Sequence, residues 1–256
     1  MTDFRIFDLS GKVAVVTGGN GGIGLGLARG LAKAGADIAI WARNEGKSEQ
    51  ARKELAALGA EVLCVGCDVS SEADTVAAVQ ATLDRFGRID SCFANAGFGH
   101  AADPVKLSLE DWRRLMATNF DGVFLSFRET AKHMIERGAG GKLVAITSIT
   151  EIFGAPIQAH YAAGKAGLGG LVRSMAVRLA RHDIQVNSIL PGWIVTDATG
   201  PAVENEKLSE IVVKRTPARR WGRTEDLEGA AVYLASDASR FHTGDSLRVD
   251  GGYSVF

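Results

Sequence analysis

The chain has 256 residues, 46% of them hydrophobic and 23% charged, and its net charge is −1. This composition is typical of a globular protein with a sizeable core. The near-neutral charge excludes the basic footprint of a nucleic-acid partner, and no apolar run is long enough to span a membrane. The first residues lack the basic, apolar and small segments of a secretory signal, so we expect a cytoplasmic protein.

The first predicted elements are a strand at 12–17, a glycine-rich turn with the sequence GGNGGIG and an amphipathic helix. Glycines let the backbone approach a pyrophosphate closely, and the helix N-terminus offers free N–H groups to it. Two registers fit the turn, GxGxxG from Gly19 and TGxxxGxG from Thr17. An ordinary glycine-rich turn is the alternative, but the flanking strand and helix favour a nucleotide site.

The second predicted strand, 37–42, bears on the choice of cofactor. Proteins that bind NAD usually end this strand on a carboxylate, which holds the ribose 2′-hydroxyl. Here the strand ends on Ala42, and Arg43 follows. Because an arginine pairs with a 2′-phosphate, this favours NADP(H) as cofactor. Glu45 is close enough in sequence to reach a ribose, which leaves NAD(H) open.

Strands and helices alternate along the rest of the chain. Further strands are predicted at 61–69, 89–97, 142–148, 183–192 and 246–252, and helices at 72–86, 108–137, 161–181 and 225–236. Such alternation indicates a single α/β domain over 1–256, with a doubly wound parallel sheet and helices on both faces. Residues 193–224 form a variable, partly helical segment within it, which we expect to bind the substrate.

Polar residues and glycines stand where the predicted strands end, at Asp68, at Asn95 to Gly97, at Ser148 and at Pro191-Gly192. In doubly wound sheets ligands bind at this carboxyl edge. Asn119 stands in the middle of a predicted helix, where asparagine is unfavourable, so a specific role is expected.

Cys64 and Cys67 form a CVGC sequence inside a predicted strand. Because the chain has no second CxxC and its histidines are scattered, we interpret both as core thiols and expect no metal site.

Ser148, Tyr161 and Lys165 suggest carbonyl chemistry. Tyr161 and Lys165 are four residues apart, so a helix brings them to one face. A nearby ammonium lowers the pKa of a phenol from its usual value of about 10, which suits it to exchange a proton near neutral pH. Ser148 is then a hydrogen-bond donor to the reacting oxygen. A surface helix with an unrelated tyrosine and lysine is the alternative.

Taken together, these residues resemble the classical short-chain dehydrogenases/reductases over essentially the whole chain. The matching residues are Thr17, Gly18, Gly22, Ile23, Gly24, Asp68, Val69, Asn95, Ala96, Gly97, Asn119, Ser148, Tyr161, Lys165, Asn187, Pro191, Gly192, Val249, Asp250, Gly251 and Gly252. One departure concerns Gly21, where family members that use NADP often carry a basic residue. The resemblance implies a Rossmann-type sheet of about seven strands in the order 3-2-1-4-5-6-7.

The resemblance also implies an NAD(P)-dependent oxidoreductase that interconverts a ketone or aldehyde and an alcohol by hydride transfer. Tyr161 is then the acid/base, Ser148 polarises the carbonyl, Lys165 lowers the tyrosine pKa and holds the ribose, and Asn119 anchors a proton-relay water. The implied cofactor-binding residues are Gly18, Asn20, Gly22, Ile23, Gly24, Arg43, Asp68, Val69, Asn95, Ala96, Gly97, Tyr161, Lys165, Pro191, Gly192, Ile194 and Thr196.

The substrate pocket is expected to draw on residues near Ser148, Tyr161 and the variable segment. These are Phe98, His100, Thr150, Glu151, Phe153, Gln158 and Trp193. Their mixed chemistry suits a sugar- or polyol-type substrate or a general ketone. A 3-oxoacyl-[acyl-carrier-protein] reductase is an alternative, with Lys132 and Arg181 as candidate contacts for the acidic carrier. A binding protein that senses NADP(H) without turnover is a second alternative, which the complete catalytic set disfavours.

The helices 109–137 and 159–181 carry apolar residues beyond one face, and the C-terminal residues 253–256 are apolar. In the family that the chain resembles, such helices and the C-terminal region form subunit contacts. We therefore expect a homotetramer with two-fold symmetry, or a homodimer.

Overall fold

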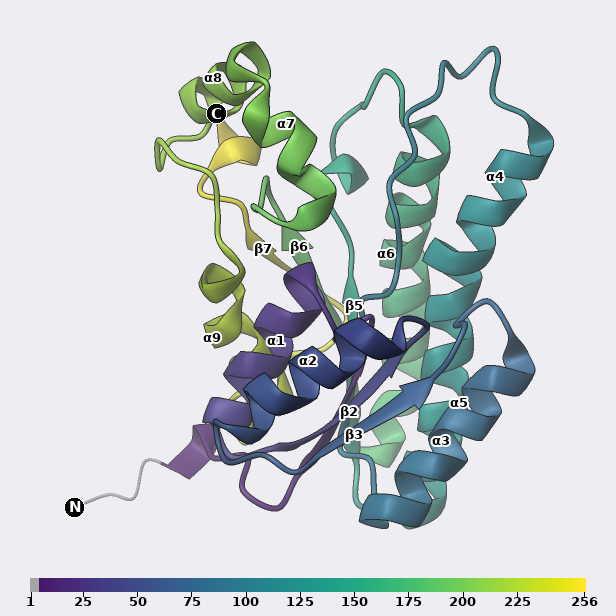
Figure 1. Ribbon diagram of the computed structural model, residues 1–256. Helices are drawn as coiled ribbons and strands as arrows, with labels where there is room; N and C mark the ends of the chain where they lie inside the picture. Colours follow the sequence, from purple (N-terminus) through teal and green to yellow (C-terminus); the bar gives the residue numbers. More distant parts are fainter. Residues whose placement is uncertain (1–4) are drawn as a thin grey trace.

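The computed structural model describes residues 5–256; residues 1–4, part of the segment inspected for a secretory signal, lie outside the described residues. Seven parallel strands form one sheet in the order β3-β2-β1-β4-β5-β6-β7, which confirms the expected topology (Figure 1). The strands are β1 Val13–Thr17, β2 Asp37–Ala42, β3 Val62–Gly66, β4 Ser91–Ala94, β5 Gly141–Ile146, β6 Ile184–Pro191 and β7 Ser246–Val249.

Helices cover both faces of this sheet (Figure 1). They are α1 Gly22–Lys33, α2 Glu45–Ala56, α3 Glu72–Phe86, α4 Leu109–Met116, α5 Gly122–Arg137, α6 Ala159–Leu179, α7 Gly200–Glu204, α8 Glu206–Arg215 and α9 Glu228–Ala235. The helices α7 and α8 stand at one end of the molecule, and the C-terminus lies beside α8 (Figure 1). Within the described residues, none of the helices is both long and apolar enough to cross a bilayer.

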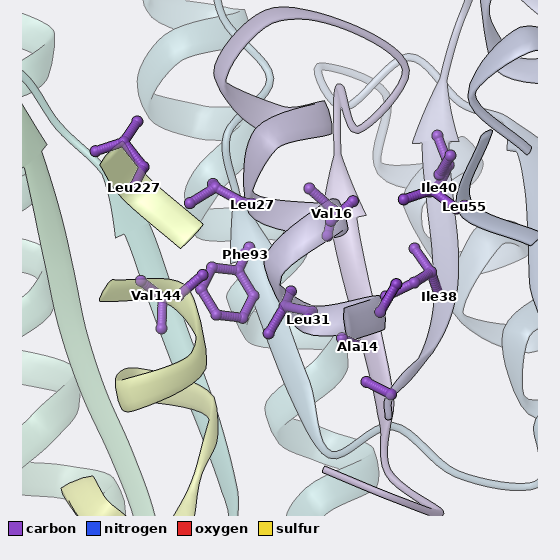
Figure 2. Packing of buried hydrophobic residues seen from close by; sticks show 14 of the residues in the cluster. Ala14, Val16, Leu27, Leu31, Ile38, Ile40, Leu55, Phe93, Val144 and Leu227 are labelled. Atoms are coloured by element: carbon purple, nitrogen blue, oxygen red, sulfur yellow. The ribbon is translucent and has the colours of Figure 1, made fainter. Parts of the chain in front are cut away.

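The central strands are apolar on both faces because each face is covered by helices. Along β2, Ile38 and Ile40 pack toward α1 and α2, whereas Ala39 and Trp41 pack toward the opposite helices. Figure 2 shows the first of these layers, in which Leu27 of α1 lies among side chains from several strands. The second layer joins the sheet to α3, α5 and α6.

One predicted element differs in detail. The helix expected over 108–137 is divided into α4 and α5 by a π-helical turn, Ala117–Asp121, that contains Asn119. Such a wide turn leaves a side chain free to bond outside its own helix, and π-turns are frequent at functional sites.

The strand order places the first reversal of the sheet between β1 and β4. Because the helices that follow these two strands cover opposite faces of the sheet, a crevice opens beyond the carboxyl ends of the strands.

Candidate active site

The turn after β1 brings the backbone close to any ligand in that crevice. Gly18 and Gly22 have φ values of 63° and 51°, the left-handed region that favours glycine. A side chain at Gly24 would place its Cβ 2.4 Å from the carbonyl oxygen of Gly18. The absence of a side chain at Gly24 therefore lets α1 start directly against the turn, with its N-terminal N–H groups facing the crevice.

A network at the ends of β1 and β4 supports this turn. The hydroxyl of Thr17 accepts hydrogen bonds from the backbone N–H groups of Asn95 and Ala96, both at 2.9 Å. The Asn95 amide in turn donates to the carbonyl of Thr17 at 3.0 Å. Asn95 therefore holds the two strand ends together and is occupied by the backbone.

A cavity of about 760 Å³ runs along the carboxyl edge of the sheet. Its volume suits an extended cofactor together with a small substrate. It is lined by nearly all the residues expected to bind the cofactor, namely Gly18, Asn20, Gly22, Ile23, Arg43, Asp68, Val69, Asn95, Ala96, Gly97, Tyr161, Lys165, Pro191, Gly192, Ile194 and Thr196. The remaining one, Gly24, lies behind the turn. The residues present therefore fit a dinucleotide.

Two ion pairs mark the end of the cavity near β2. A guanidinium nitrogen of Arg43 lies 3.6 Å from a carboxylate oxygen of Asp68, and both side chains are exposed. Hydrogen bonds from Ser70 lower the pKa of Asp68. Lys47 reaches across the cavity wall to Asp197, at 2.8 Å. Arg43 and Lys47 both line the cavity and can pair with a phosphate, although each already lies beside a carboxylate with which the phosphate would compete.

The amide of Asn20 points away from the expected pyrophosphate, toward α2. It donates to the carbonyl of Asn44 and to the hydroxyl of Ser48, both at 3.1 Å. Asn20 thus lines the cavity while bonding the start of α2 to the glycine-rich turn.

Asn119 is fully buried and bonded to the loop that follows β4. Its amide oxygen accepts from the backbone N–H of Phe98 at 3.0 Å, and its amide nitrogen donates to the carbonyl of Phe98 at 2.8 Å. The two bonds hold the start of the 98–102 loop, which forms part of the cavity wall through Phe98, Gly99 and Ala101.

Ser148 and Tyr161 meet in the cavity from different elements. Ser148 follows β5 and accepts a hydrogen bond from the backbone N–H of Thr150 at 3.2 Å, which orients its side chain. Tyr161 stands in the first turn of α6. Burial raises the pKa of Tyr161, and a hydrogen bond with Ser148 opposes that rise.

Lys165 lies one turn further along α6 and is buried. Its ammonium donates to the carbonyl of Ile146 at 2.6 Å, and lies 5.7 Å from the ring centroid of Tyr161. Burial lowers the pKa of Lys165 to about 8. The predicted lowering of the Tyr161 pKa is not seen among these residues, because burial of the phenol outweighs the influence of its neighbours. A further positive charge in the cavity is needed to lower the pKa of Tyr161.

The residues expected to bind substrate divide into two groups. Phe98, Gln158 and Trp193 line the cavity, whereas His100, Thr150, Glu151 and Phe153 do not. A ring nitrogen of His100 lies 3.2 Å from one of the buried His160. Glu151 packs against Gly169 of α6, where burial raises the pKa of its carboxyl. Phe153 packs edge-on to Tyr253 of the C-terminal segment. His100, Glu151 and Phe153 thus contact other protein groups, whereas the Thr150 hydroxyl is buried without a hydrogen-bond partner among the described residues.

Lys47, Asp197 and Arg215 carry contacts near the cavity that the sequence pattern did not single out. Lys47 and Asp197 are far apart in the chain and occupy polar segments, so nothing local marks their pairing. The Arg215 guanidinium lies over the rings of Phe153 and Tyr253. That contact depends on three distant segments, so a sequence pattern does not reveal it.

Comparison with known proteins agrees with this geometry. A family model described as enoyl-(acyl carrier protein) reductase matches residues 18–254. Gluconate 5-dehydrogenase of Gluconobacter oxydans is 40% identical over 98% of this chain and 97% of its own length. The 5-keto-D-gluconate 5-reductase of Escherichia coli is 39% identical, covering 98% of both chains.

A gluconate 5-dehydrogenase from Burkholderia cenocepacia, solved in complex with NADP and tartrate, superposes with a TM-score of 0.94. It is 40% identical and covers 98% of each chain. The chain described here belongs to the short-chain dehydrogenase/reductase family of oxidoreductases.

Proposed function

We propose that this protein interconverts a keto sugar acid and the corresponding hydroxy acid, with NADP(H) as the preferred cofactor. The observation that carries this is the meeting of Ser148, Tyr161 and Lys165 in one cavity that continues to the glycine-rich turn. The similarity to dehydrogenases and reductases of gluconate and ketogluconate supports the substrate class. NAD(H) remains the alternative cofactor.

A nicotinamide cofactor held along this cavity would supply, in the reductive direction, a hydride from its C4 atom to the carbonyl carbon. The carbonyl π-electrons move to oxygen, and Tyr161 gives its phenolic proton to that oxygen. Ser148 donates a hydrogen bond to the same oxygen as negative charge develops on it. In the oxidative direction Tyr161 takes the alcohol proton back.

Two residues support this chemistry without exchanging a proton with the substrate directly. Lys165 is held by the carbonyl of Ile146 and would orient the ribose of a bound cofactor. Together with the positive ring of an oxidised cofactor, its charge favours the phenolate form of Tyr161. Asn119 keeps the wall of the site in place through Phe98. We infer that it also anchors the water that returns a proton to Lys165.

The preference for NADP(H) rests on charge at the β2 end of the cavity. Arg43 stands where an NAD-binding protein usually has a carboxylate, and Lys47 adds a second cation to the cavity wall. Two similar proteins have been solved with NADP bound, which supports the same choice here.

The acyl-carrier alternative has less support. Lys132 forms an ion pair with Glu129 at 2.8 Å, and Arg181 donates to the neighbouring His182. Lys132 therefore offers little uncompensated charge to an acidic carrier protein.

The test is reduction of 5-keto-D-gluconate, L-sorbose and acetoacetyl-CoA, each with NADPH and with NADH. We expect 5-keto-D-gluconate with NADPH to give the highest kcat/KM. Tyr161→Phe is the control, since loss of a general acid lowers the rate by roughly 100- to 10,000-fold. Cofactor binding, followed by fluorescence, should survive in this variant.

A preference for acetoacetyl-CoA would overturn the sugar-acid proposal in favour of the acyl alternative. Tight NADPH binding without turnover of any of the three compounds would favour the non-catalytic binding protein. Activity that is unchanged in Tyr161→Phe would remove Tyr161 from the proposed mechanism.

We also propose a homotetramer. Apolar side chains remain exposed on the two long helices, such as Val177 at 84%, and at the C-terminus, where Phe256 is 75% exposed. A second copy that covers these faces would remove apolar surface from water. Size-exclusion chromatography with light scattering should give four times the 27.0 kDa chain mass. A monomer at micromolar concentration would contradict the proposal.

A further inference from the structure

We propose that Arg215 binds the carboxylate of the substrate and so selects sugar acids over neutral sugars. This rests on the proposed function, because it assumes that the substrate carries an acid group in addition to its reacting carbonyl. Three features of Arg215 support this role: its guanidinium is held by two aromatic rings, it has no acidic partner among the described residues, and Tyr253 links it to Trp193, which lines the cavity.

Arg215 is the last residue of α8, and its guanidinium is held by aromatic rings. The guanidinium carbon lies 4.8 Å from the ring centroid of Phe153 and 4.4 Å from that of Tyr253. Stacking on aromatic rings restrains the plane of an arginine while its N–H edge stays available. The side chain is therefore preorganised for a planar acceptor, and a carboxylate matches that fork with two parallel hydrogen bonds.

The charge of Arg215 is not neutralised within the protein. Among residues 5–256, no carboxylate lies within ion-pair distance of it, and its guanidinium makes no hydrogen bond. The next two arginines are different. Arg219 donates to the carbonyl of Lys214 at 2.6 Å, and Arg220 pairs with Asp226 at 2.6 Å. Arg215 is thus held in place, but no carboxylate among residues 5–256 pairs with its charge.

The aromatic contacts connect Arg215 to the active site. Phe153 lies in the segment that joins Ser148 to Tyr161. The ring of Tyr253 lies 6.0 Å from that of Phe153 and 6.5 Å from that of Trp193, and Trp193 lines the cavity. The C-terminus lies beside α8, the helix that ends at Arg215 (Figure 1).

The cavity itself offers the substrate little other positive charge. Its lining contains three cationic residues, and two of them, Arg43 and Lys47, stand at the β2 end. The third, Lys165, donates to Ile146 and lies beneath Tyr161. A carboxylate several bonds away from the reacting carbonyl therefore finds no further cation in this lining. We assign that role to Arg215, which is linked through Tyr253 to the lining residue Trp193.

The experiment compares Arg215→Gln and Arg215→Lys with the unchanged enzyme on 5-keto-D-gluconate and on the neutral ketose L-sorbose. Loss of a charged hydrogen-bonding pair should raise KM for the acid about 10- to 100-fold in Arg215→Gln. In Arg215→Gln, KM for L-sorbose should change less than about threefold. The KM of Arg215→Lys for 5-keto-D-gluconate should lie between those of the unchanged enzyme and Arg215→Gln. Lys207→Gln, which removes one exposed charge from the same helix, is the matched control.

Binding of tartrate to the NADPH complex, measured by calorimetry, gives a readout that does not need turnover. We expect tartrate to bind the unchanged enzyme and Lys207→Gln alike, and Arg215→Gln at least about tenfold more weakly. Equal losses for 5-keto-D-gluconate and L-sorbose, or tartrate binding that is absent or is unaffected by Arg215→Gln, would overturn the assignment. If the unchanged enzyme does not reduce 5-keto-D-gluconate, the proposed function fails, and the tartrate comparison still decides the role of Arg215.

Discussion

The ammonium of Lys165 donates a 2.6 Å hydrogen bond to the carbonyl of Ile146, the last residue of β5. This bond ties the first turns of α6 to the strand that delivers Ser148. It also explains how a buried lysine is kept in a defined position next to Tyr161 before a cofactor adds its own contacts.

Burial of Lys165 should make the stability of the cofactor-free protein depend on alkaline pH. The pKa of Lys165 is lowered from 10.5 to about 8, so between these values the unfolded chain binds more protons than the folded chain. Stability contributed by this group therefore rises with pH across that window, by up to roughly 3 kcal/mol. Urea unfolding from pH 7.5 to 10 should show this rise in the unchanged protein relative to Lys165→Met.

Lys142 offers a comparison for that measurement. It is also buried, burial lowers its pKa to about 8, and it lies at the other end of β5, away from the cavity. Lys142→Met should remove a similar part of the pH dependence while leaving cofactor binding unchanged. Parallel stability curves for the unchanged protein and Lys165→Met would show that Lys165 stays protonated in both the folded and the unfolded state, which would contradict the lowered pKa.

Arg43 should decide the choice between the two nicotinamide cofactors. Arg43→Ala removes a charged partner of the 2′-phosphate, so the Kd for NADPH should rise about 10- to 100-fold. The Kd for NADH should change less than about threefold, since it lacks that phosphate. Lys53→Ala is the control, because Lys53 lies on α2 and pairs with Glu49 outside the cavity lining. Equal effects on both cofactors would argue against a contact with the phosphate.

Asn119 should matter for stability and for substrate binding together. Asn119→Ala leaves the part-buried N–H and carbonyl groups of Phe98 without their partners, which should lower the free energy of unfolding by about 2 kcal/mol. KM should also rise, because Phe98 lines the cavity. Denaturant unfolding and steady-state kinetics measure the two effects.

Asn205→Ala is a useful contrast to this variant. It removes the N-cap bond to Leu208 on α8 and should cost about 1 kcal/mol. Because Asn205 does not line the cavity, KM should stay unchanged. If Asn119→Ala likewise lowers stability without a change in KM, the role of Asn119 is structural only.

The buried His160 should weaken the protein in mild acid. Burial is the main reason that its pKa lies below 6.5, and the neighbouring His100 adds to this, while Asp111 opposes it. The unfolded chain therefore binds more protons just below pH 6.5, so stability falls as the pH drops through that value toward the lowered pKa. His160→Leu should lose this part of the slope between pH 7 and pH 5 in thermal unfolding. An unchanged slope would show that other groups account for it.

The same pair of histidines positions the wall of the cavity. His100 lies on the 98–102 loop, and His160 directly precedes Tyr161. A second bond, from the N–H of Ala102 to the carbonyl of Ile157 at 2.8 Å, holds the same loop. His100 was expected to contact the substrate, but in the structure its ring contacts His160 instead.

The amino-acid sequence by itself determined the alternation of strands and helices, the glycine-rich turn and the positions of Ser148, Tyr161 and Lys165, whereas the strand order was implied by the family resemblance. These depend on local signals, since apolar strand runs, a phosphate-binding turn and an i,i+4 pair are each read within a few residues. The carboxyl edge of a parallel sheet then gathers them without further information.

Only the tertiary structure decided which residues near the site face the cavity. Glu151 and Phe153 follow Ser148 closely, yet one packs against α6 and the other against Tyr253. The stacking of Arg215 and the pairing of Lys47 with Asp197 join segments that are far apart in the chain. Such contacts depend on the packing of whole elements against one another, which local patterns of polarity and charge do not specify.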